Sequence, residues 1–146
     1  MTAKNTVSGT VTHTVYYDGA CPLCRGEMAL LMKRNAAGLL DFVDISAPGF
    51  DPAPLGVRLD AMLQLMHVRQ RDGSWLIGIP AFEVMYAATG FHTTARWLRR
   101  PWFARLAARA YPWLVRHRYQ LPHTLVRGLF RIQQRACPAD AACRVR

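Results

Sequence analysis

Hydrophobic residues follow two different periods near the start of the chain, and the change of period separates a strand from a helix. The stretch from Val11 to Tyr17 is β-rich and alternates between polar and apolar positions, which predicts a strand. Met28, Leu31 and Met32 then recur at helical spacing, which predicts a helix over residues 22–34. Pro22 suits the first helical position because no hydrogen bond from its nitrogen is needed there.

The same patterns predict the elements that follow. We expect strands over 40–45, 65–69 and 75–79, a loop over 46–57, and helices over 58–64 and 80–89. The order β-α-β-α-β-β-α is typical of a small α/β sandwich. A right-handed βαβ crossover would make the first two strands parallel.

Four prolines divide the C-terminal part of the chain. Because proline starts or stops helices, they predict three short helices after residue 92 rather than one long helix. They are Pro101, Pro112, Pro122 and Pro138.

Charge is distributed very unevenly along the chain, whose formal net charge is +10. Residues 1–90 hold seven basic and eight acidic side chains, whereas residues 91–146 hold twelve arginines and one acid, Asp140. The basic excess therefore belongs to the C-terminal helices. It suggests an anionic partner there: nucleic acid, a membrane surface or an acidic protein.

Length and composition restrict the class of protein. The 146 residues, 51% of them hydrophobic, suit one globular domain rather than a disordered chain. We expect no transmembrane segment and no secretory signal, because no long apolar run is present and the N-terminus is polar. These features favour a cytoplasmic protein, in which cysteines stay reduced unless they react.

The candidate chemistry lies in Cys21-Pro22-Leu23-Cys24, between the first predicted strand and the first predicted helix. Cysteines three residues apart at a helix start lie close enough to form a disulfide. The unpaired amides and dipole of a helix N-terminus favour a thiolate. We therefore expect Cys21 to be an exposed nucleophile and Cys24, one turn further in, to be a less exposed resolving cysteine.

A zinc site is the main alternative for this cysteine pair. Structural zinc normally needs a second close pair of ligands, but the other cysteines, Cys137 and Cys143, lie more than a hundred residues away. They are interpreted either as a pair that forms a disulfide or relays electrons to the first pair or, in slight preference, as unpaired thiols near the terminus. The histidines also lack ligand spacing, so we expect neither a metal nor another cofactor; they are His13, His67, His92, His117 and His123.

The segment YYDGACPLCRGEM, residues 16–28, resembles the signature of the DCC family of thiol-disulfide oxidoreductases, with Asp18, Cys21 and Cys24 in its three defining places. MHVRQRDGSWLIGIPAF, residues 66–82, is similar to the family's second segment, and residues 111–118 are similar to its C-terminal stretch. The resemblance covers about residues 12–120. It implies a thioredoxin-like fold and a redox role.

Other side chains near the motif and in the tail have two interpretations each. Asp18 would either accept a proton from Cys24 or shape the Asp-Gly turn. Arg25 would stabilise a thiolate or, more simply, lie in solvent. Three tryptophans of the tail are interpreted as core aromatics in preference to anchors at a membrane or partner surface; they are Trp97, Trp102 and Trp113.

The sequence thus predicts a thioredoxin-like α/β sandwich over residues 10–92, with a flexible arm over 1–9 and a basic helical extension over 93–146. Its expected function is thiol-disulfide exchange with a protein or small-molecule thiol or disulfide, with Cys21, Cys24 and Asp18 as catalytic residues. The competing hypothesis is a basic binding module for an anionic membrane, partner protein or nucleic acid, in which the cysteine pair is structural or binds zinc.

Overall fold

The order of helices and strands follows the sequence prediction closely. The computed structural model describes residues 11–122, 124–125, 127–128 and 131, so the predicted N-terminal arm over 1–9 lies outside the described residues. The elements are β1 (His13–Tyr17), α1 (Pro22–Arg34), β2 (Leu40–Asp44), a 3₁₀ turn (Ala53–Leu55), α2 (Leu59–Gln64), β3 (His67–Gln70), β4 (Trp75–Ile77), α3 (Ile79–Ala88), α4 (His92–Arg99) and α5 (Pro101–His117).

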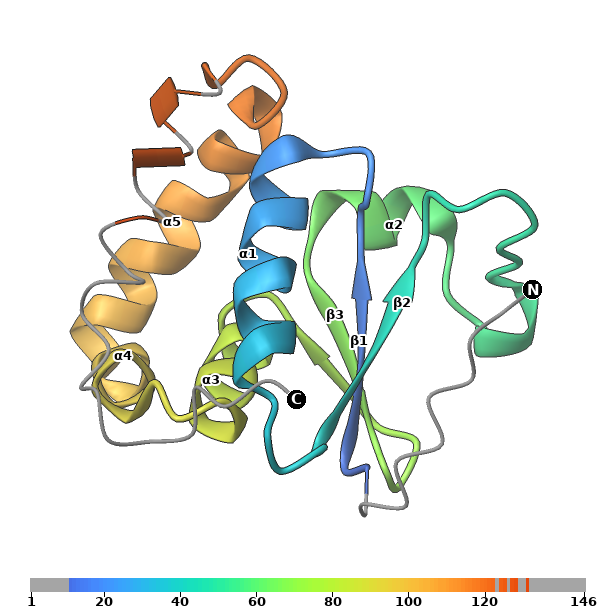
Figure 1. Ribbon diagram of the computed structural model, residues 1–146, viewed down its shortest axis with the longest axis horizontal. Helices are drawn as coiled ribbons and strands as arrows, with labels where there is room; N and C mark the ends of the chain where they lie inside the picture. The colour runs from blue at the N-terminus through green and yellow to red at the C-terminus, as the bar shows by residue number, and fades with distance from the viewer. Residues whose placement is uncertain (1–10, 123, 126, 129–130, 132–146) are drawn as a thin grey trace.

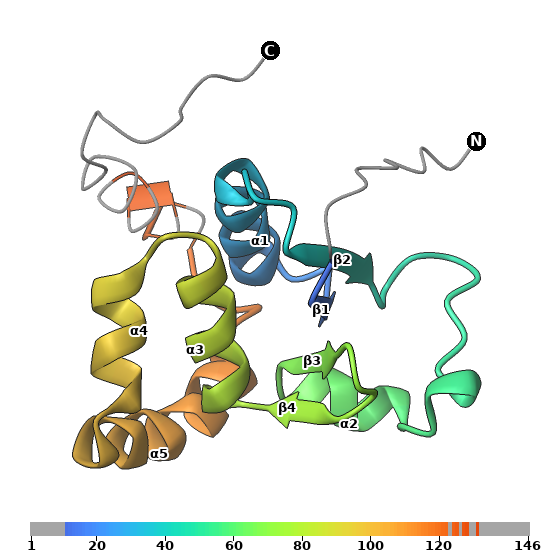
Figure 2. The ribbon, with the colours of Figure 1, turned by 90° about the horizontal axis from the view of Figure 1, so that it is seen from below.

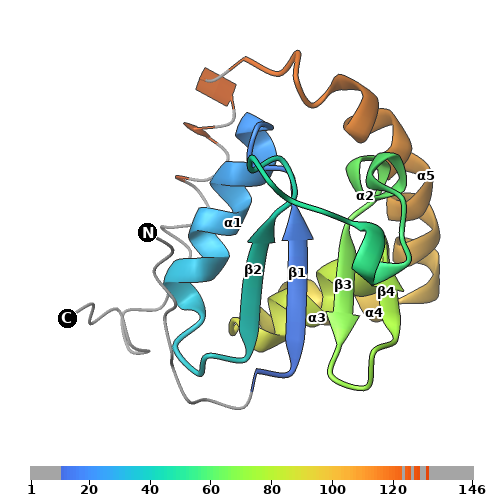
Figure 3. The same ribbon diagram turned by 90° about the vertical axis from the view of Figure 1, so that its right-hand side faces the viewer.

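The strands form one mixed four-stranded sheet in the order β2-β1-β3-β4 (Figure 3). β1 pairs in parallel with β2, as the βαβ crossover predicted, and antiparallel with β3. β3 and β4 form the predicted hairpin, whose turn places Gly73 at φ 87°. The fold is therefore mixed α/β.

The alternation along β1 sends its side chains to two separate cores. Val15 packs on one face with residues of α1 and α3, including Met28 and Met85. Tyr16 packs on the other face with Ile45 and with Met62 of α2. The sheet is thus covered on both faces, and α1 runs alongside the strands on one side of the sheet in Figure 1. This packing fixes the end of β1 and the start of α1, where the cysteine pair lies.

The last two helices of the described chain lie beside α3. α4 packs against α3, and α5 packs against both, so the three helices group at one side of the sheet (Figure 2). Pro101 begins α5, as expected, but the prediction that Pro112 starts or stops a helix is wrong, because Pro112 lies inside α5. Pro112 and Ala108 are exposed, so water can hydrogen-bond the Ala108 carbonyl that loses its helical partner.

The preference for core tryptophans in the tail is also wrong. Trp97, Trp102 and Trp113 keep 43%, 56% and 62% of their surface exposed. Tyr111, in contrast, is the α5 side chain that packs against the main core. None of the helices in the described ranges is long and apolar enough to span a membrane.

Candidate active site

The cysteine pair lies at the junction of β1 and α1, in the strand–turn–helix setting that the sequence predicted. Cys21 is the N-cap of α1, with extended backbone angles of φ −80° and ψ 119°, and Pro22 begins the helix. The amide of Cys24 donates a hydrogen bond to Cys21 Sγ over 3.3 Å. The Cys21 sulfur thus takes the place that a serine or aspartate oxygen commonly occupies at a helix start.

This position stabilises negative charge on Cys21. The pKa of Cys21 is lowered to about 6, mainly by the hydrogen bond from the Cys24 side chain. The Cys24 amide and the charge of Arg118 lower it further, and these effects outweigh burial, which alone would raise the pKa. The pKa of Cys24 is raised, because its thiol donates to Cys21, is partly withdrawn from water and lies beside the Cys21 charge. The two thiols therefore differ strongly in acidity, and Cys21 is the one that ionises first.

The expected exposure of the two cysteines is reversed in the structure. Cys21 has no exposed surface, whereas Cys24 is partly exposed. The prediction failed because the N-cap geometry turns the Cys21 sulfur inward, toward the first helical amides. A substrate sulfur reaches Cys21 only if a neighbouring group moves.

An arginine from the end of α5 completes the site. Arg118, the C-cap of α5, donates to Cys24 Sγ over 3.7 Å and to Asp18 Oδ2 over 3.0 Å. The side chains of Arg118 and Asp18 are only 11% and 3% exposed. Figure 1 shows how the end of α5 lies beside the start of α1. The ion pair therefore joins the C-terminal helix to the cysteine loop in a largely dry environment.

Tyr119 adds a second contact to the same carboxylate. Its hydroxyl donates to Asp18 Oδ2 and accepts a hydrogen bond from Arg118 over 3.2 Å. Burial and the hydrogen bond to Asp18 raise the pKa of Tyr119 to about 12, so its hydroxyl keeps its proton at neutral pH. Arg118 and Tyr119 together hold the segment after α5 over the turn that leads to Cys21.

The turn itself depends on Asp18, Gly19 and Asp44. Asp18 Oδ1 accepts from the Ala20 amide over 3.0 Å, and Asp44 Oδ1 accepts from the Gly19 amide over 2.9 Å. A Cβ atom on Gly19 would lie 2.1 Å from Asp44 Oδ2, so a larger residue cannot occupy this place unless Asp44 moves. Asp18 therefore shapes the turn, which was one of the two interpretations drawn from the sequence. It also binds Arg118.

A cavity of about 50 Å³ lies beside Cys24 and is lined by residues of α1, α2, α3 and α5. Its polar groups include Glu27 and Tyr111. Burial raises the pKa of Glu27, whose carboxylate accepts a hydrogen bond from Tyr86. The Tyr111 hydroxyl accepts from the Met66 amide over 2.9 Å, which ties α5 to the start of β3.

Sequence reasoning missed Arg118 and Tyr119 as members of the site. The available signal was the likeness of residues 111–118 to a family segment, but linear spacing cannot show that Arg118 meets Asp18 a hundred residues earlier. Arg25 is exposed, which agrees with its interpretation as a solvated residue. Cys137 and Cys143 lie outside the described residues.

The described part of the chain places no cluster of metal ligands around the cysteines. Over residues 11–122 and the described positions beyond them, no three His, Cys, Asp or Glu side chains gather as a metal site would require. Cys21 and Cys24 are both free thiols. The described side chains thus supply a dithiol, an arginine and a carboxylate as the reactive groups.

Comparison with known proteins gives one family match and one curated relative. The model of the DCC1-like thiol-disulfide oxidoreductase family matches residues 15–124. An uncharacterized chloroplastic protein of Arabidopsis thaliana is 38% identical over 76 residues, which are 51% of this chain and 36% of the plant protein. The chain therefore spans about a third of the length of that relative. No solved structure matches significantly.

Proposed function

Because the chain belongs to the DCC1-like thiol-disulfide oxidoreductase family, we propose that it exchanges a Cys21–Cys24 disulfide with thiols or disulfides of its substrates. Cys21 is the attacking thiolate and Cys24 the resolving thiol. The substrate is a protein or small molecule that carries an accessible sulfur. No zinc or other cofactor takes part in this scheme.

One observation carries the proposal: the Cys21 sulfur caps α1 and accepts the Cys24 amide over 3.3 Å. A thiolate attacks disulfides, and a thiol does not. With a pKa of about 6, Cys21 is mostly ionised at neutral pH, whereas an ordinary cysteine with a pKa of about 8.5 is only a few per cent ionised. A purely structural role would not require a cysteine whose pKa is this far below the ordinary value.

The reaction proceeds in two exchanges. The Cys21 thiolate attacks one sulfur of a substrate disulfide, and the other substrate sulfur leaves as a thiolate and takes a proton from solvent. Cys24 then attacks the Cys21 sulfur of the mixed disulfide, its proton passing to the second substrate thiolate. Two electrons move from the protein dithiol to the substrate, which becomes two thiols while Cys21 and Cys24 become a disulfide.

Arg118 and Asp18 serve this chemistry in two ways. The Arg118 guanidinium lies 3.7 Å from Cys24 Sγ, so its charge stabilises whichever cysteine carries the thiolate. Asp18 holds that guanidinium in place. Since Cys21 has no exposed surface, we propose that the segment of Arg118 and Tyr119 moves away from Asp18 to admit the substrate.

We propose that the fold is thioredoxin-like over residues 10–92, with the basic helices from residue 93 onward packed on the same domain. The strand order β2-β1-β3-β4 and the cysteine pair after β1 support this assignment. We also propose a cytoplasmic setting, because a reducing compartment returns the disulfide to the dithiol after each turnover.

The decisive experiment traps the mixed disulfide. All variants are made with Cys137 and Cys143 replaced by serine, so that only the two candidate thiols remain. The proteins are incubated with an aromatic disulfide, and adducts are located by peptide mass spectrometry. Cys24→Ser should accumulate an adduct on Cys21, whereas the protein that keeps both cysteines should release it and form the internal disulfide.

Cys21→Ser is the matched variant. It should lose turnover with insulin or the aromatic disulfide to near background, while its far-ultraviolet circular dichroism stays unchanged. Adduct formation on Cys24 in Cys21→Ser, at the rate seen with both cysteines present, would reverse the two roles. Equal turnover in Cys21→Ser and its parent would end the proposal.

A further inference from the structure

The chain carries a surface that the proposed redox chemistry does not use, on the outer side of α5. Figure 3 shows α5 at the edge of the molecule, away from the sheet. Between Glu83 and Gly128 the sequence contains no acidic residue, whereas residues 91–122 contain seven arginines. The two helices in this region thus present positive charge without internal compensation, apart from the contacts of Arg99 with Glu83 and Arg118 with Asp18.

Apolar and basic side chains share one face of α5. Trp102, Leu106, Arg109, Trp113 and Arg116 follow one another at intervals of four, three, four and three residues, which places them on a single stripe of an α-helix. We call this stripe the α5 outer face.

The large apolar residues of the α5 outer face are exposed rather than packed. Trp102, Leu106 and Trp113 keep 56%, 59% and 62% of their surface in solvent. Trp102 lies edge-on to the neighbouring Trp97 with 6.0 Å between ring centres, and Trp97 is itself 43% exposed. A folded protein usually buries such side chains, so a contiguous exposed group of them marks a contact surface.

We propose that the α5 outer face docks on the surface of an anionic lipid bilayer. An amphipathic helix with tryptophan and leucine on one side and arginines around them lies flat at a membrane interface. The indole rings occupy the headgroup level, and the arginines bind the acidic headgroups. Arg105, Arg109 and Arg116 are exposed and make no ion pair within the described part of the chain.

The composition of the α5 outer face argues against two other occupants, a second copy of the chain and a nucleic acid. A two-fold dimer through the α5 outer face would place arginines against arginines, with no nearby carboxylate to pair them. The phosphates of a nucleic acid would pair with the arginines. They offer no apolar surface, however, against which Leu106, the aliphatic residue of the stripe, could be buried. A lipid interface accommodates both the charges and the apolar side chains.

Vesicle co-sedimentation of the full chain tests the proposal. The probes are vesicles of phosphatidylcholine alone and of phosphatidylcholine mixed with phosphatidylglycerol. The protein should bind the mixed vesicles, bind the neutral vesicles far more weakly, and be released as salt is raised. Tryptophan emission should shift to shorter wavelength on binding, because indole rings leave water.

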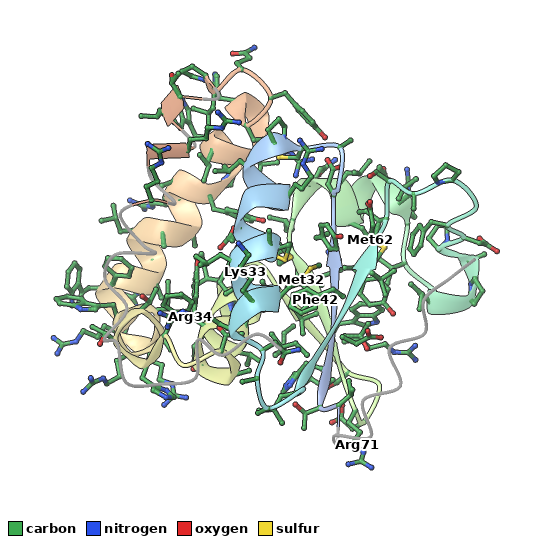
Figure 4. The ribbon with its side chains drawn as sticks, viewed as in Figure 1. Met32, Lys33, Arg34, Phe42, Met62 and Arg71 are labelled. Atoms are coloured by element: carbon green, nitrogen blue, oxygen red, sulfur yellow. The ribbon has the colours of Figure 1, made fainter. Side chains whose placement is uncertain are left out.

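Paired variants identify the surface. Arg109→Gln with Arg116→Gln should weaken binding about 25-fold, since each arginine near an anionic surface contributes about fivefold. Trp102→Ala with Trp113→Ala should weaken binding at least about tenfold and reduce the emission shift, because only Trp97 remains beside this surface. Arg71→Gln and Ile77→Ala are the controls, because Arg71 points away from the rest of the protein (Figure 4) and Ile77 is 44% exposed on β4.

Several outcomes would overturn the proposal. They are binding to neither kind of vesicle at low salt, equal binding to both, and equal loss of binding in the control and α5 variants. Gel shift of a nucleic acid in the absence of vesicle binding would replace the membrane with a different partner. None of these outcomes bears on exchange at Cys21, which is measured without vesicles.

Discussion

The Arg118 guanidinium donates a hydrogen bond to the Asp18 carboxylate over 3.0 Å and connects two segments that lie a hundred residues apart in the chain. Asp18 precedes the cysteine pair, and Arg118 follows the last complete helix of the described chain. The ion pair therefore couples the packing of the C-terminal helices to the charge distribution around the cysteines. The first prediction addresses this coupling.

Replacing Arg118 with methionine should destabilise the protein by about 3 kcal/mol, because it leaves the 3%-exposed Asp18 carboxylate without a counter-ion. The loss is measured by urea unfolding of the reduced protein. Arg116→Met, at an exposed residue of the same helix, should change stability little. Adding Asp18→Asn to Arg118→Met should recover part of the loss; a further loss instead would show that the two side chains act independently.

The second prediction concerns the acidity of Cys21. Ultraviolet absorbance of the thiolate, followed against pH, should show a transition near pH 6 that disappears in Cys21→Ser. Because a hydrogen bond from the Cys24 side chain is the main cause of the low pKa, Cys24→Ala should move the transition to higher pH. Cys24→Ser keeps a donor and should move it less. Identical titrations in the two Cys24 variants would contradict this cause.

The same low pKa makes a prediction about stability. A thiol whose pKa is lowered on folding stabilises the fold fully above its unfolded pKa of about 8.5, and the contribution is lost as pH falls toward the folded value of about 6. The difference in unfolding free energy between the reduced protein and Cys21→Ser should therefore shrink as pH falls through this window. A difference that grows on acidification would show that the folded thiol is not acidic.

Gly19 provides a test of the turn before the cysteines. Gly19→Ala should destabilise the protein by about 1–3 kcal/mol, because its Cβ would lie 2.1 Å from Asp44 Oδ2. Gly128→Ala is the matched control, since a Cβ there meets no atom of the described residues within 4 Å. Adding Asp44→Ala should relieve the clash and restore part of the stability. If Gly19→Ala unfolds at the same urea concentration as the unsubstituted protein, the turn is less constrained than its geometry indicates.

The last prediction concerns the buried carboxyl of Glu27. Burial raises its pKa, so its charge destabilises the fold increasingly as pH rises above about 4.5. Glu27→Gln keeps an oxygen that accepts from Tyr86 and should be more stable than the parent at pH 7 but about equally stable near pH 4. Glu83→Gln, which removes the ion pair with Arg99, should show no such gain. The prediction is tested by comparing the unfolding midpoints of Glu27→Gln and the parent across this pH range.

The sequence by itself determined the elements from β1 to α3 and the place of the cysteines. The alternation of Val11–Tyr17 predicted β1, and helical spacing with Pro22 predicted α1 to within a residue. These predictions succeeded because each depends on interactions between residues close in the chain: strand alternation, helix periodicity and the geometry of a helix start. The parallel pairing of β1 and β2 followed as well, because the handedness of βαβ crossovers leaves little choice.

Only the tertiary structure decided what surrounds the cysteines. Local pattern favoured an exposed Cys21, but Cys21 is fully buried, and its partner Cys24 accepts a hydrogen bond from Arg118. Linear spacing cannot show that a residue 94 positions further along the chain contacts Cys24. The tryptophans of α4 and α5 show the same limit. Helical spacing places Trp102 and Trp113 on one face, but whether that face meets the core or solvent depends on how α5 packs, and Tyr111 occupies the core side instead.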